Sequence, residues 1–524
     1  MRVLLVRPPV PPRTIGLKNV MICEPLELEY VAAGLEGHEV QIMDMILERG
    51  FERRLQEFRP DVVGTSCYIT GVNEVKKLCR TVKCHSPTCF TVVGGVQAAR
   101  CPDDFIEPAI DCIALGDGTT VMKQIVDALD AGRPLTEIPG LALRHEGHLH
   151  RTAPGDYMPD PDSIPLPRRD LVAHLRHRYY YAFHQPVALM KTTWGCWYKC
   201  NFCYTWRITD GRVYSRSPES IAEELEAIDA DDVYIVDDIF LINRRRLSRL
   251  AQLIRARGIK KNLLVYSRAD FICENEDVIA EWASLGLRAV FIGLEASTDR
   301  ELESMDKRCT ADKNRLAIEI LRRNGVDTYG SLIPQPDYEP EDWERLWNFV
   351  DETGLYYVNI SPMTPYPGTT IWEQYKRDVT VPRSAHELWD LSHVLLPTRM
   401  PLRAYYWQLI KLYAKTSLDL RRARRLTLRT RPPIWSLTYL RLWLGAMRIF
   451  LQFVRAHRHH DPDHLADAMD LGPAVAPVPP VIGWQPSDTT PCSCQVDVPA
   501  GQLASARSHA RRAIAPQVSE GGAE

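Results

Sequence analysis

The first 135 residues alternate between short, continuously apolar runs and longer stretches with apolar residues at helical spacing. Continuous apolar runs of this length are typical of buried parallel strands, and the stretches between them predict helices. The predicted strands are Arg2–Arg7, Val40–Met43, Asp61–Ser66, Cys89–Val93 and Cys112–Leu115, and the predicted helices cover 25–35, 48–58, 72–83, 102–108 and 119–131. This alternation predicts an α/β domain with a doubly wound, Rossmann-like parallel sheet.

A second series of strand and helix patterns runs through residues 186–383. The predicted strands are Pro186–Met190, Val233–Asp237, Asn262–Tyr266, Ala289–Gly293, Asp327–Ile333 and Tyr356–Ile360. About six such units predict a partial (β/α)6 barrel of the TIM type. In barrels and in open parallel sheets, ligands bind at the carboxyl ends of the strands, so polar residues at those ends are the candidates for chemistry.

The remaining segments differ in pattern. Residues 136–185 contain a proline-rich stretch at 159–167 and are expected to connect the two domains. Residues 384–460 are predominantly helical in pattern, whereas 470–524 lose all periodicity and are rich in Pro, Ala and Val near their start. That composition predicts a mostly disordered tail.

Composition and charge exclude several classes of protein. The chain has 524 residues, too many for a single core, and its net charge of −3 gives no reason to expect nucleic-acid binding. Met1–Arg7 is patterned as a buried strand and not as a signal peptide, and no apolar run approaches the length of a membrane span. We therefore expect a cytoplasmic enzyme, in which the 14 cysteines do not form a disulfide framework.

Three cysteines lie in a loop that follows the apolar run Pro186–Met190. Cys196, Cys200 and Cys203 have the spacing C-x3-C-x2-C, and no fourth Cys or His lies nearby in the sequence. Three thiolates can hold three irons of a [4Fe–4S] cube and leave the fourth iron open, whereas structural zinc normally takes four protein ligands. The spacing therefore favours an iron–sulfur cluster over zinc.

This motif, with the aromatic Phe202 before its last cysteine, resembles the signature of radical S-adenosylmethionine (SAM) enzymes. The resemblance implies that SAM chelates the open iron and that polar residues at later strand ends hold the rest of it. The matching positions are Asp237, Asp238, Ser267, Arg268 and Glu295. An acidic side chain suits the amino group of SAM, and arginine suits its carboxylate. Alternatively, the two aspartates cap a helix and Arg268 pairs with Asp270.

Three turns follow predicted strands of the first domain at Thr65–Ser66, Gly94–Gly95 and Gly116–Gly118. Together with the cluster motif downstream, they resemble the cobalamin-binding domain of class B radical-SAM enzymes. The resemblance implies that Thr65, Ser66 and Thr70 line the slot for the nucleotide tail, and that the glycines let it approach the backbone closely. A Rossmann-like domain for another nucleotide, or for none, would have similar turns.

The sequence contains no D-x-H-x-x-G motif, through which many cobalamin proteins supply a histidine to cobalt. The loop after the first strand has no histidine at all, and His38 is expected at a surface turn after the next helix. We therefore predict a corrin bound without a histidine below the cobalt.

The segments Val236–Asp238, Asn359–Gly368 and Leu391–Leu402 narrow the resemblance to the hopanoid C-3 methylases, over roughly residues 1–410. This resemblance implies a C-methyltransferase in which a 5′-deoxyadenosyl radical activates an unactivated carbon of a polycyclic lipid, and cobalamin supplies the methyl group. It also implies an electron donor such as flavodoxin or ferredoxin. A cobalamin-dependent cyclase or methylase acting on a tetrapyrrole or another natural product would share every cofactor motif.

The C-terminal region carries a basic run at 421–431 and then a stretch, 434–454, with arginines at seven-residue spacing among aromatic residues. This pattern is typical of an amphipathic helix at a bilayer surface and predicts peripheral contact with the inner membrane face. A helix packed on the barrel would have the same pattern.

Overall fold

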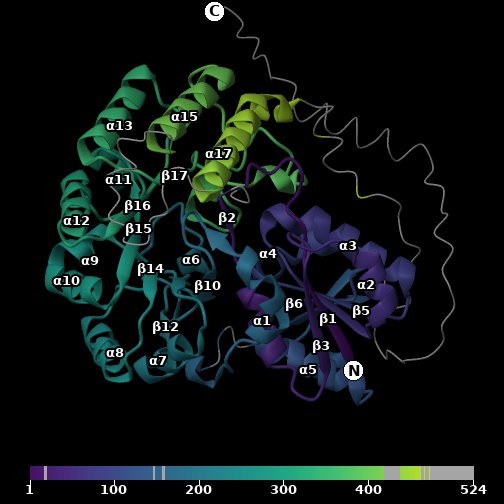
Figure 1. Ribbon diagram of the computed structural model, residues 1–524. Helices are drawn as coiled ribbons and strands as arrows, with labels where there is room; N and C mark the ends of the chain where they lie inside the picture. The colour runs from purple at the N-terminus through teal and green to yellow at the C-terminus, as the bar shows by residue number, and fades with distance from the viewer. Residues whose placement is uncertain are drawn as a thin grey trace, which may run out of the picture.

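The computed structural model describes residues 1–16, 20–145, 148–155, 158, 160–417, 437–461, 465 and 471. The basic run at 421–431 and, apart from Leu471, the predicted tail at 470–524 lie outside these residues. The described chain folds into two α/β units that lie side by side, with a pair of helices across the top of both (Figure 1).

The N-terminal unit contains a seven-stranded sheet in the order β3-β1-β4-β5-β6-β7-β8. The strands are β1 (Arg2–Arg7), β3 (Glu39–Asp44), β4 (Val62–Ser66), β5 (Phe90–Gly94), β6 (Cys112–Ala114), β7 (Leu141–His145) and β8 (His148–Arg151). The first five are parallel, and β7 and β8 extend the edge in antiparallel fashion within the segment expected to be a connector.

Helices cover both faces of this sheet because successive residues of each buried strand point to opposite sides. Val3 and Leu5 of β1 pack under α1 (Leu26–Ala33) and α5 (Gly118–Asp130), whereas Leu4 and Val6 pack on the other face. That face carries α2 (Phe51–Phe58), α3 (Val72–His85) and α4 (Val96–Arg100). The doubly wound prediction is thereby confirmed. The single helix predicted at 102–108 was wrong, because Pro102 separates α4 from a 3₁₀ turn at Pro102–Phe105.

The second unit is a six-stranded, fully parallel sheet in the order β10-β13-β14-β15-β16-β17. Its strands are β10 (Val187–Met190), β13 (Asp232–Ile235), β14 (Asn262–Ser267), β15 (Leu287–Glu295), β16 (Asp327–Leu332) and β17 (Val358–Ile360). The edge strands β10 and β17 do not pair with each other, so the sheet curls into an open half-barrel, as predicted.

Helices surround the outer face of the half-barrel. They are α7 (Pro218–Ala227), α8 (Arg244–Arg257), the shorter α9 (Ala269–Glu274), α10 (Glu276–Leu285), α12 (Ala311–Arg323) and α13 (Pro340–Thr353). Their apolar faces and the outward-facing strand residues form one continuous core, in which Trp282 and Trp343 are fully buried. The short helices α6 (Thr205–Ile208), α11 (Asp299–Ser304) and α14 (Thr370–Tyr375) contribute no residue to this core. Burial of such side chains, at about 1.5–3 kcal/mol for an aliphatic one, stabilises the barrel.

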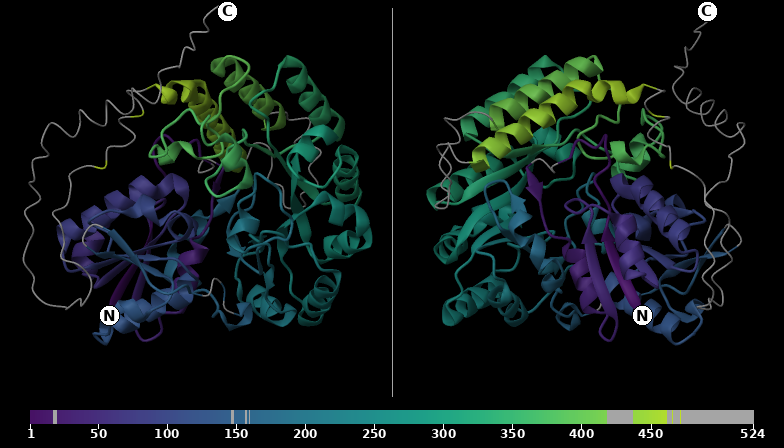
Figure 2. Two further views of the ribbon diagram at one scale, coloured as in Figure 1. Left: turned by 180° about the vertical axis from the view of Figure 1, so that it is seen from behind. Right: turned by 45° about the vertical axis from the view of Figure 1, so that its right-hand side comes forward.

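Two structures close the open side of the half-barrel. The short strand β2 (Met21–Ile22) of the N-terminal segment pairs with β9 (Tyr180–Tyr181) just before the barrel begins. Helices α15 (Leu402–Ser417) and α17 (Leu437–Ala456) lie side by side across the top (Figure 2), and Tyr405, Leu409 and Phe453 join the barrel core. None of the helices in the described residues is both long enough and apolar enough to span a bilayer.

Candidate active site

The three motif cysteines line one cavity of about 490 Å³ at the carboxyl ends of the barrel strands. Their loop follows β10 and the short strand β11 (Thr193–Trp194), which pairs with β12 (Tyr214–Ser215). The loop turns at Gly195, whose φ is +87° and where a Cβ atom would lie 2.1 Å from the carbonyl oxygen of Arg212. Only glycine fits there, so this residue fixes the direction in which the cysteines leave the strand.

The thiols are partly or wholly enclosed. Burial, together with the two neighbouring cysteines, raises the pKa of Cys196 to about 11, and burial also raises the pKa of Cys203. Within the described residues no three Cys, His, Asp or Glu side chains are grouped closely enough to hold a single metal ion. A cube binds each thiolate through a different iron and keeps its ligands farther apart, so a trio around one cavity fits a cluster better than zinc.

The two neighbouring aspartates after β13 face different surroundings. Asp237 is buried outside the cavity, and it accepts hydrogen bonds from the backbone nitrogens of Thr192 and Thr193 at 2.6 and 2.9 Å. Asp238 lines the cavity and accepts a hydrogen bond from the nitrogen of Gly195 at 2.6 Å. Asp237 therefore anchors the strand that leads to the cysteine loop, and only Asp238 is available to a ligand.

Ser267 and Arg268, at the end of β14, both line the cavity and are buried. Arg268 forms an ion pair with Asp270 at 2.9 Å and donates to the carbonyl oxygen of Lys307 at 2.7 Å. Its guanidinium also lies 3.7 Å from the ring centre of Tyr198, inside the cysteine loop. Arg268 therefore pairs with Asp270, as one alternative predicted, and it also lines the cavity, so the predicted contact with SAM stays a prediction.

Glu295 ends β15 in a left-handed conformation, with a φ of +62°. Its carboxylate accepts hydrogen bonds from the Lys307 ammonium at 2.7 Å and from the Ser331 hydroxyl at 2.9 Å. Burial would lower the pKa of Lys307, but the Glu295 carboxylate beside it outweighs this effect and raises the pKa. Lys307 was missed from the sequence, because it follows a helix and belongs to no strand end or motif.

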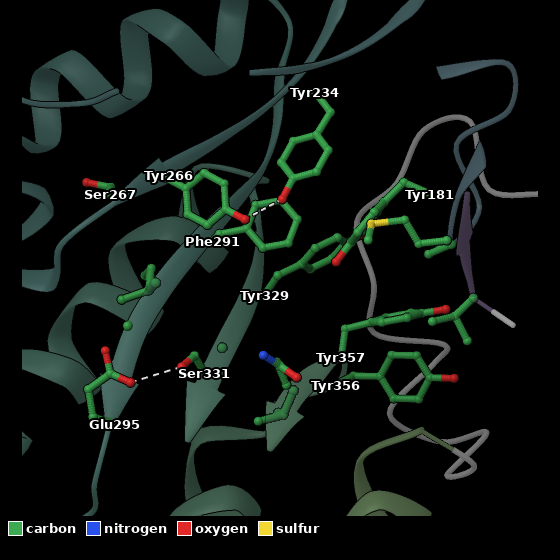
Figure 3. A pocket seen from close by; sticks show the side chains of 18 of the residues that line it. Tyr181, Tyr234, Tyr266, Ser267, Phe291, Glu295, Tyr329, Ser331, Tyr356 and Tyr357 are labelled. Atoms are coloured by element: carbon green, nitrogen blue, oxygen red, sulfur yellow. Dashed lines mark hydrogen bonds between the residues drawn. The ribbon is translucent and has the colours of Figure 1, made fainter. Parts of the chain in front are cut away.

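One wall of the cavity is aromatic (Figure 3). Tyr266, Phe291 and Tyr329 are in register on neighbouring strands, and the ring of Phe291 lies 4.9–5.0 Å from each of the other two. The wall comprises Tyr181, Tyr234, Tyr266, Phe291, Tyr329, Tyr356 and Tyr357. Burial raises the pKa of Tyr181, Tyr234 and Tyr329 well above the usual value, so these rings are neutral. The sequence signal for this wall is one aromatic residue on each successive strand of the barrel.

Helix α17 forms the opposite side of the cavity. Its lining residues are Leu442, Trp443, Ala446, Ile449 and Phe450. The cavity is therefore polar where it meets the strand ends and the cysteines, and apolar towards α17. Ser267, Glu295 and Ser331 lie to one side of the aromatic rings in Figure 3.

The N-terminal unit contains a second cavity, of about 460 Å³, at the carboxyl edge of its sheet. Six of the seven residues predicted there line it: Thr65, Ser66, Gly94, Gly95, Gly116 and Gly118. Thr70 does not, because it lies beyond the strand end in the 3₁₀ turn Ile69–Gly71. Gly95 has a φ of +91°, and a Cβ atom would lie 2.8 Å from the nitrogen of Cys67, so the backbone itself forms the wall here.

The donor set of this second cavity suits a large ligand with a flat, apolar part. The hydroxyl of Thr65 is buried and has no hydrogen-bond partner within the described structure. Leu5, Val92 and Met122 form the deep wall between the sheet and its helices, and the described lining contains no histidine. His38 instead bonds to Asp127 at 3.0 Å on another part of the unit.

The N-terminal cavity extends to the domain boundary, where Trp194 and Ile208 of the barrel unit line it. Tyr68, which follows β4, is 66% exposed and is not among the described lining residues of either cavity.

Residues 12–126 match the family model of the B12 binding domain, and residues 190–350 match that of the Radical SAM superfamily. The chain is 34% identical over 398 residues to a hopanoid C-3 methylase from Methylococcus capsulatus, which covers 74% of this chain and 75% of that protein. It belongs to the cobalamin-binding radical SAM enzymes. The enzyme is thus a radical SAM methyltransferase by type, as the sequence motifs predicted.

More distant relatives of this radical SAM enzyme have other activities. It is 24% identical over 340 residues to the anaerobic magnesium-protoporphyrin IX monomethyl ester cyclase of Rubrivivax gelatinosus, covering 63% of this chain and 60% of that one. Its fold is that of the cobalamin-dependent SAM radical enzyme OxsB, solved with aqua-cobalamin and SAM, at a TM-score of 0.63 and 14% identity over 89% of this chain and 78% of that one. The cofactors of the enzyme are cobalamin, through its B12 binding domain, and SAM with a [4Fe–4S] cluster, through its radical SAM domain.

Proposed function

We propose that this enzyme methylates an unactivated carbon of a hopanoid-type polycyclic lipid. The observation that carries this proposal is the aromatic wall of the barrel cavity, which continues directly into the residues around the cysteine loop. Stacked neutral rings favour a flat, saturated hydrocarbon through apolar burial and dispersion contacts. The volume of about 490 Å³ lies within the usual range for ligand pockets.

The charges of the cavity favour a neutral substrate over an anionic one. Its only described cationic lining residues are Arg268 and Lys307, and each is paired with a carboxylate, of Asp270 or Glu295. A tetrapyrrole with propionate groups would need further cations away from the polar end, which is assigned to SAM below, because a buried carboxylate is costly without a partner. The described lining towards α17 contains none.

We assign the SAM contacts to the polar end of the cavity. Cys196, Cys200 and Cys203 would hold the cluster, whose chemistry is to reduce SAM and release a 5′-deoxyadenosyl radical. Asp238, whose carboxylate faces the cavity and lies 3.5 Å from the Lys191 ammonium, would accept from the amino group of SAM, and Arg268 offers guanidinium donors for a carboxylate. Ser267, Glu295 and Ser331 are positioned for hydroxyl groups. The Glu295–Lys307 pair keeps this end rigid before SAM binds.

We assign cobalamin to the N-terminal cavity through its turns. Gly94, Gly95 and Gly116 allow close approach to the backbone, and the unpartnered hydroxyl of Thr65 offers a hydrogen bond. Bound there, cobalamin supplies the methyl group. The chain's own contribution is to align donor and acceptor across the domain boundary, where Trp194 of the barrel unit lines the N-terminal cavity.

The physiological reductant is proposed to be a flavodoxin or ferredoxin. Trp197, beside the cluster ligand Cys196, is 48% exposed, and Lys199 next to it is exposed as well. This surface gives an acidic electron carrier a short path to the cluster. We place the enzyme in the cytoplasm, with peripheral attachment at the inner membrane face, where a bilayer lipid is accessible.

The test is anaerobic reconstitution with iron, sulfide and cobalamin, followed by incubation with a hopanoid and isotopically labelled SAM. We expect a methylated hopanoid, with S-adenosylhomocysteine and 5′-deoxyadenosine formed in equal amounts. A related cyclase activity would give 5′-deoxyadenosine but no homocysteine product. Methyl transfer to a tetrapyrrole in preference to the hopanoid would overturn the substrate assignment and leave the reaction type intact.

A further inference from the structure

Helix α17 is unusual because apolar residues occupy all of its sides. Phe453 and Ala456 are buried in the barrel core, and Ala446 and Ile449 line the substrate cavity. The outward side carries Leu437, Leu440, Leu444, Met447, Leu451 and Val454, which are 36–84% exposed. A helix on a protein surface normally presents polar residues outward, so this outward stripe needs a covering partner.

The charges around the stripe are all positive. Neither α15 nor α17 contains an aspartate or glutamate. On α17, Arg448 and Arg455 are exposed beside the stripe. On the neighbouring α15, Arg403, Trp407 and Lys411 follow one another at four-residue spacing and are exposed, Trp407 to 53%. The two helices therefore form one outward face that is apolar, aromatic and cationic.

The stripe residues recur at alternating spacings of three and four, which is also the pattern of a coiled-coil seam. A second copy of this chain would bring its own arginines to the flanks of that seam. Paired coiled-coil helices normally carry acidic and basic residues at these positions, and here no acidic residue is available to either copy. The charge pattern therefore opposes self-association and matches an anionic lipid surface.

We propose that the outward faces of α15 and α17 form a docking surface for an anionic lipid bilayer, and that the substrate reaches the cavity past α17. The proposed docking surface is argued from the exposed residues alone, whereas the proposed route of the substrate rests on the proposed function, in which the substrate is a lipid. Trp443 connects the two, because it is 52% exposed and also lines the cavity. The helix is thus a partition between the bilayer surface and the reaction space.

Arg441 tethers the N-terminal half of α17 to the body of the protein. Arg441 bonds to the side chain of Gln185 and donates to the carbonyl oxygen of Ala182 at 3.1 Å, and its guanidinium lies 3.7 Å from the ring centre of Tyr180. The residues that this tether holds in place, Leu442 and Trp443, are the ones that close the cavity. Movement of this half of the helix opens the cavity towards the docked bilayer.

The docking experiment uses the full-length holoenzyme and vesicles of phosphatidylglycerol and phosphatidylcholine in equal parts, with pure phosphatidylcholine for comparison. The test variant combines L440Q, L444Q and L451Q, which lie outside the cavity lining. The matched control combines I106Q, L166Q and L316Q, three apolar residues exposed on other surfaces. We expect wild type and control to sediment with the anionic vesicles, and the test variant to bind at least about tenfold more weakly.

A second variant, R448Q with R455Q, tests the cationic flank. Each arginine near an anionic surface contributes about fivefold to binding, so we expect a loss of roughly 25-fold at low salt that shrinks as salt increases. Unchanged melting temperature and cluster absorbance in both variants establish that they fold. These binding measurements contain no substrate, so they test the docking surface even if the enzyme proves not to act on a hopanoid.

Three results would overturn the proposal. The first is absence of wild-type binding to anionic vesicles, and the second is equal binding by wild type and the L440Q/L444Q/L451Q variant. The third is a wild-type dimer in sedimentation velocity that the same substitutions dissociate, since the stripe then belongs to a second copy. The route of the substrate is tested with R441Q. This variant should raise the ratio between the rate of methylation of vesicle-embedded hopanoid and the rate of SAM cleavage without substrate, and an unchanged ratio would contradict the route past α17.

Discussion

The two cavities of this enzyme differ in how their walls at the strand ends are built. In the N-terminal cavity this part of the wall is backbone, at turns where Gly94, Gly95 and Gly116 have no side chains, whereas Leu5, Val92 and Met122 form the deep wall. The barrel cavity is formed by side chains, with an aromatic wall on one side and ion pairs such as Glu295–Lys307 on the other. A backbone wall can only admit or exclude a ligand, whereas a side-chain wall can be altered one residue at a time.

This difference teaches which cavity decides what the enzyme acts on. In the function proposed above, the N-terminal cavity takes cobalamin whatever the substrate is, and its glycines leave little to vary. The barrel cavity then takes the substrate, and its rings sit on strands whose backbone does not depend on them. Substitutions should therefore have all-or-none effects on one side of the molecule and graded effects on the other.

The largest effect is expected from substitution of the proposed cluster ligands in the barrel cavity. Replacing Cys200 by Ala should abolish 5′-deoxyadenosine formation and the absorbance of the reconstituted cluster, because two thiolates no longer hold the cube. Cys309→Ala is the control, since Cys309 is a half-buried cysteine that does not line the cavity. Full activity of the Cys200 variant would refute the cluster assignment.

The backbone wall can be tested with a pair of glycines. Gly95→Ala should weaken cobalamin binding by more than about 100-fold, because its Cβ atom would meet the nitrogen of Cys67 at 2.8 Å in a left-handed conformation. Gly132→Ala has the same kind of φ, +65°, but no atom within 4 Å, so it should cost only about 1 kcal/mol of stability. Equal cobalamin affinity in both variants, measured by absorbance titration, would contradict the backbone-wall interpretation.

Substitutions of the two neighbouring aspartates should affect different properties, SAM affinity for Asp238 and stability for Asp237. Asp238→Asn should weaken SAM binding about tenfold and leave the melting temperature nearly unchanged, since only one charged contact is lost. Asp237→Asn should instead lower the free energy of unfolding by about 1–3 kcal/mol, because a buried acceptor of several hydrogen bonds is altered. Calorimetric titration with SAM and thermal melts distinguish them, and a reversed pattern would exchange their roles.

The smallest effect concerns the roof of the barrel cavity. Burial and three nearby histidines lower the pKa of His460 to about 3, so it is neutral in the folded protein. Its stabilising contribution is present above the unfolded pKa of about 6.5 and is lost as pH falls below that value, by at most about 1.4 kcal/mol per pH unit. Hydrogen exchange of α17 should therefore quicken between about pH 7 and pH 5.5, and less so in His460→Gln. The N-terminal cavity has no described histidine in its lining and should keep its cobalamin over this range.

Local motifs and strand ends could be predicted from the sequence because both are encoded within a few residues. The cysteine spacing indicated the cluster, and the apolar runs indicated which turns meet at a sheet edge. Asp237 and Asp238 could not be separated, because neighbouring residues point in different directions only once the end of β13 is known. Lys307 reaches the site by tertiary packing of a helix end, which no local pattern encodes.

The C-terminal helix also shows that tertiary contacts cannot be predicted from local sequence patterns. The amphipathic pattern at 434–454 predicted α17, but its arginines do not form one exposed stripe, because Arg441 turns inward to Gln185. The histidines that follow α17 also have partners in distant segments: His459 bonds to the buried His393 at 2.8 Å, and His460 lies 3.5 Å from the hydroxyl of Tyr406. Such pairings join segments that are far apart in the chain.

The small sheet of β2 and β9 has a consequence for how the enzyme is made. In this sheet, Met21 pairs with Tyr181 and Ile22 pairs with Tyr180. The strand β2 is therefore synthesised early, whereas its partner β9 is synthesised only after the whole N-terminal sheet. During translation the first domain can complete its own strands, but the segment around β2 must stay unpaired until the ribosome has passed residue 181. Contacts of such long separation form slowly, which makes this segment a natural site for chaperone binding. Cofactor loading into the barrel must wait for the same event, because Met21 lines the barrel cavity.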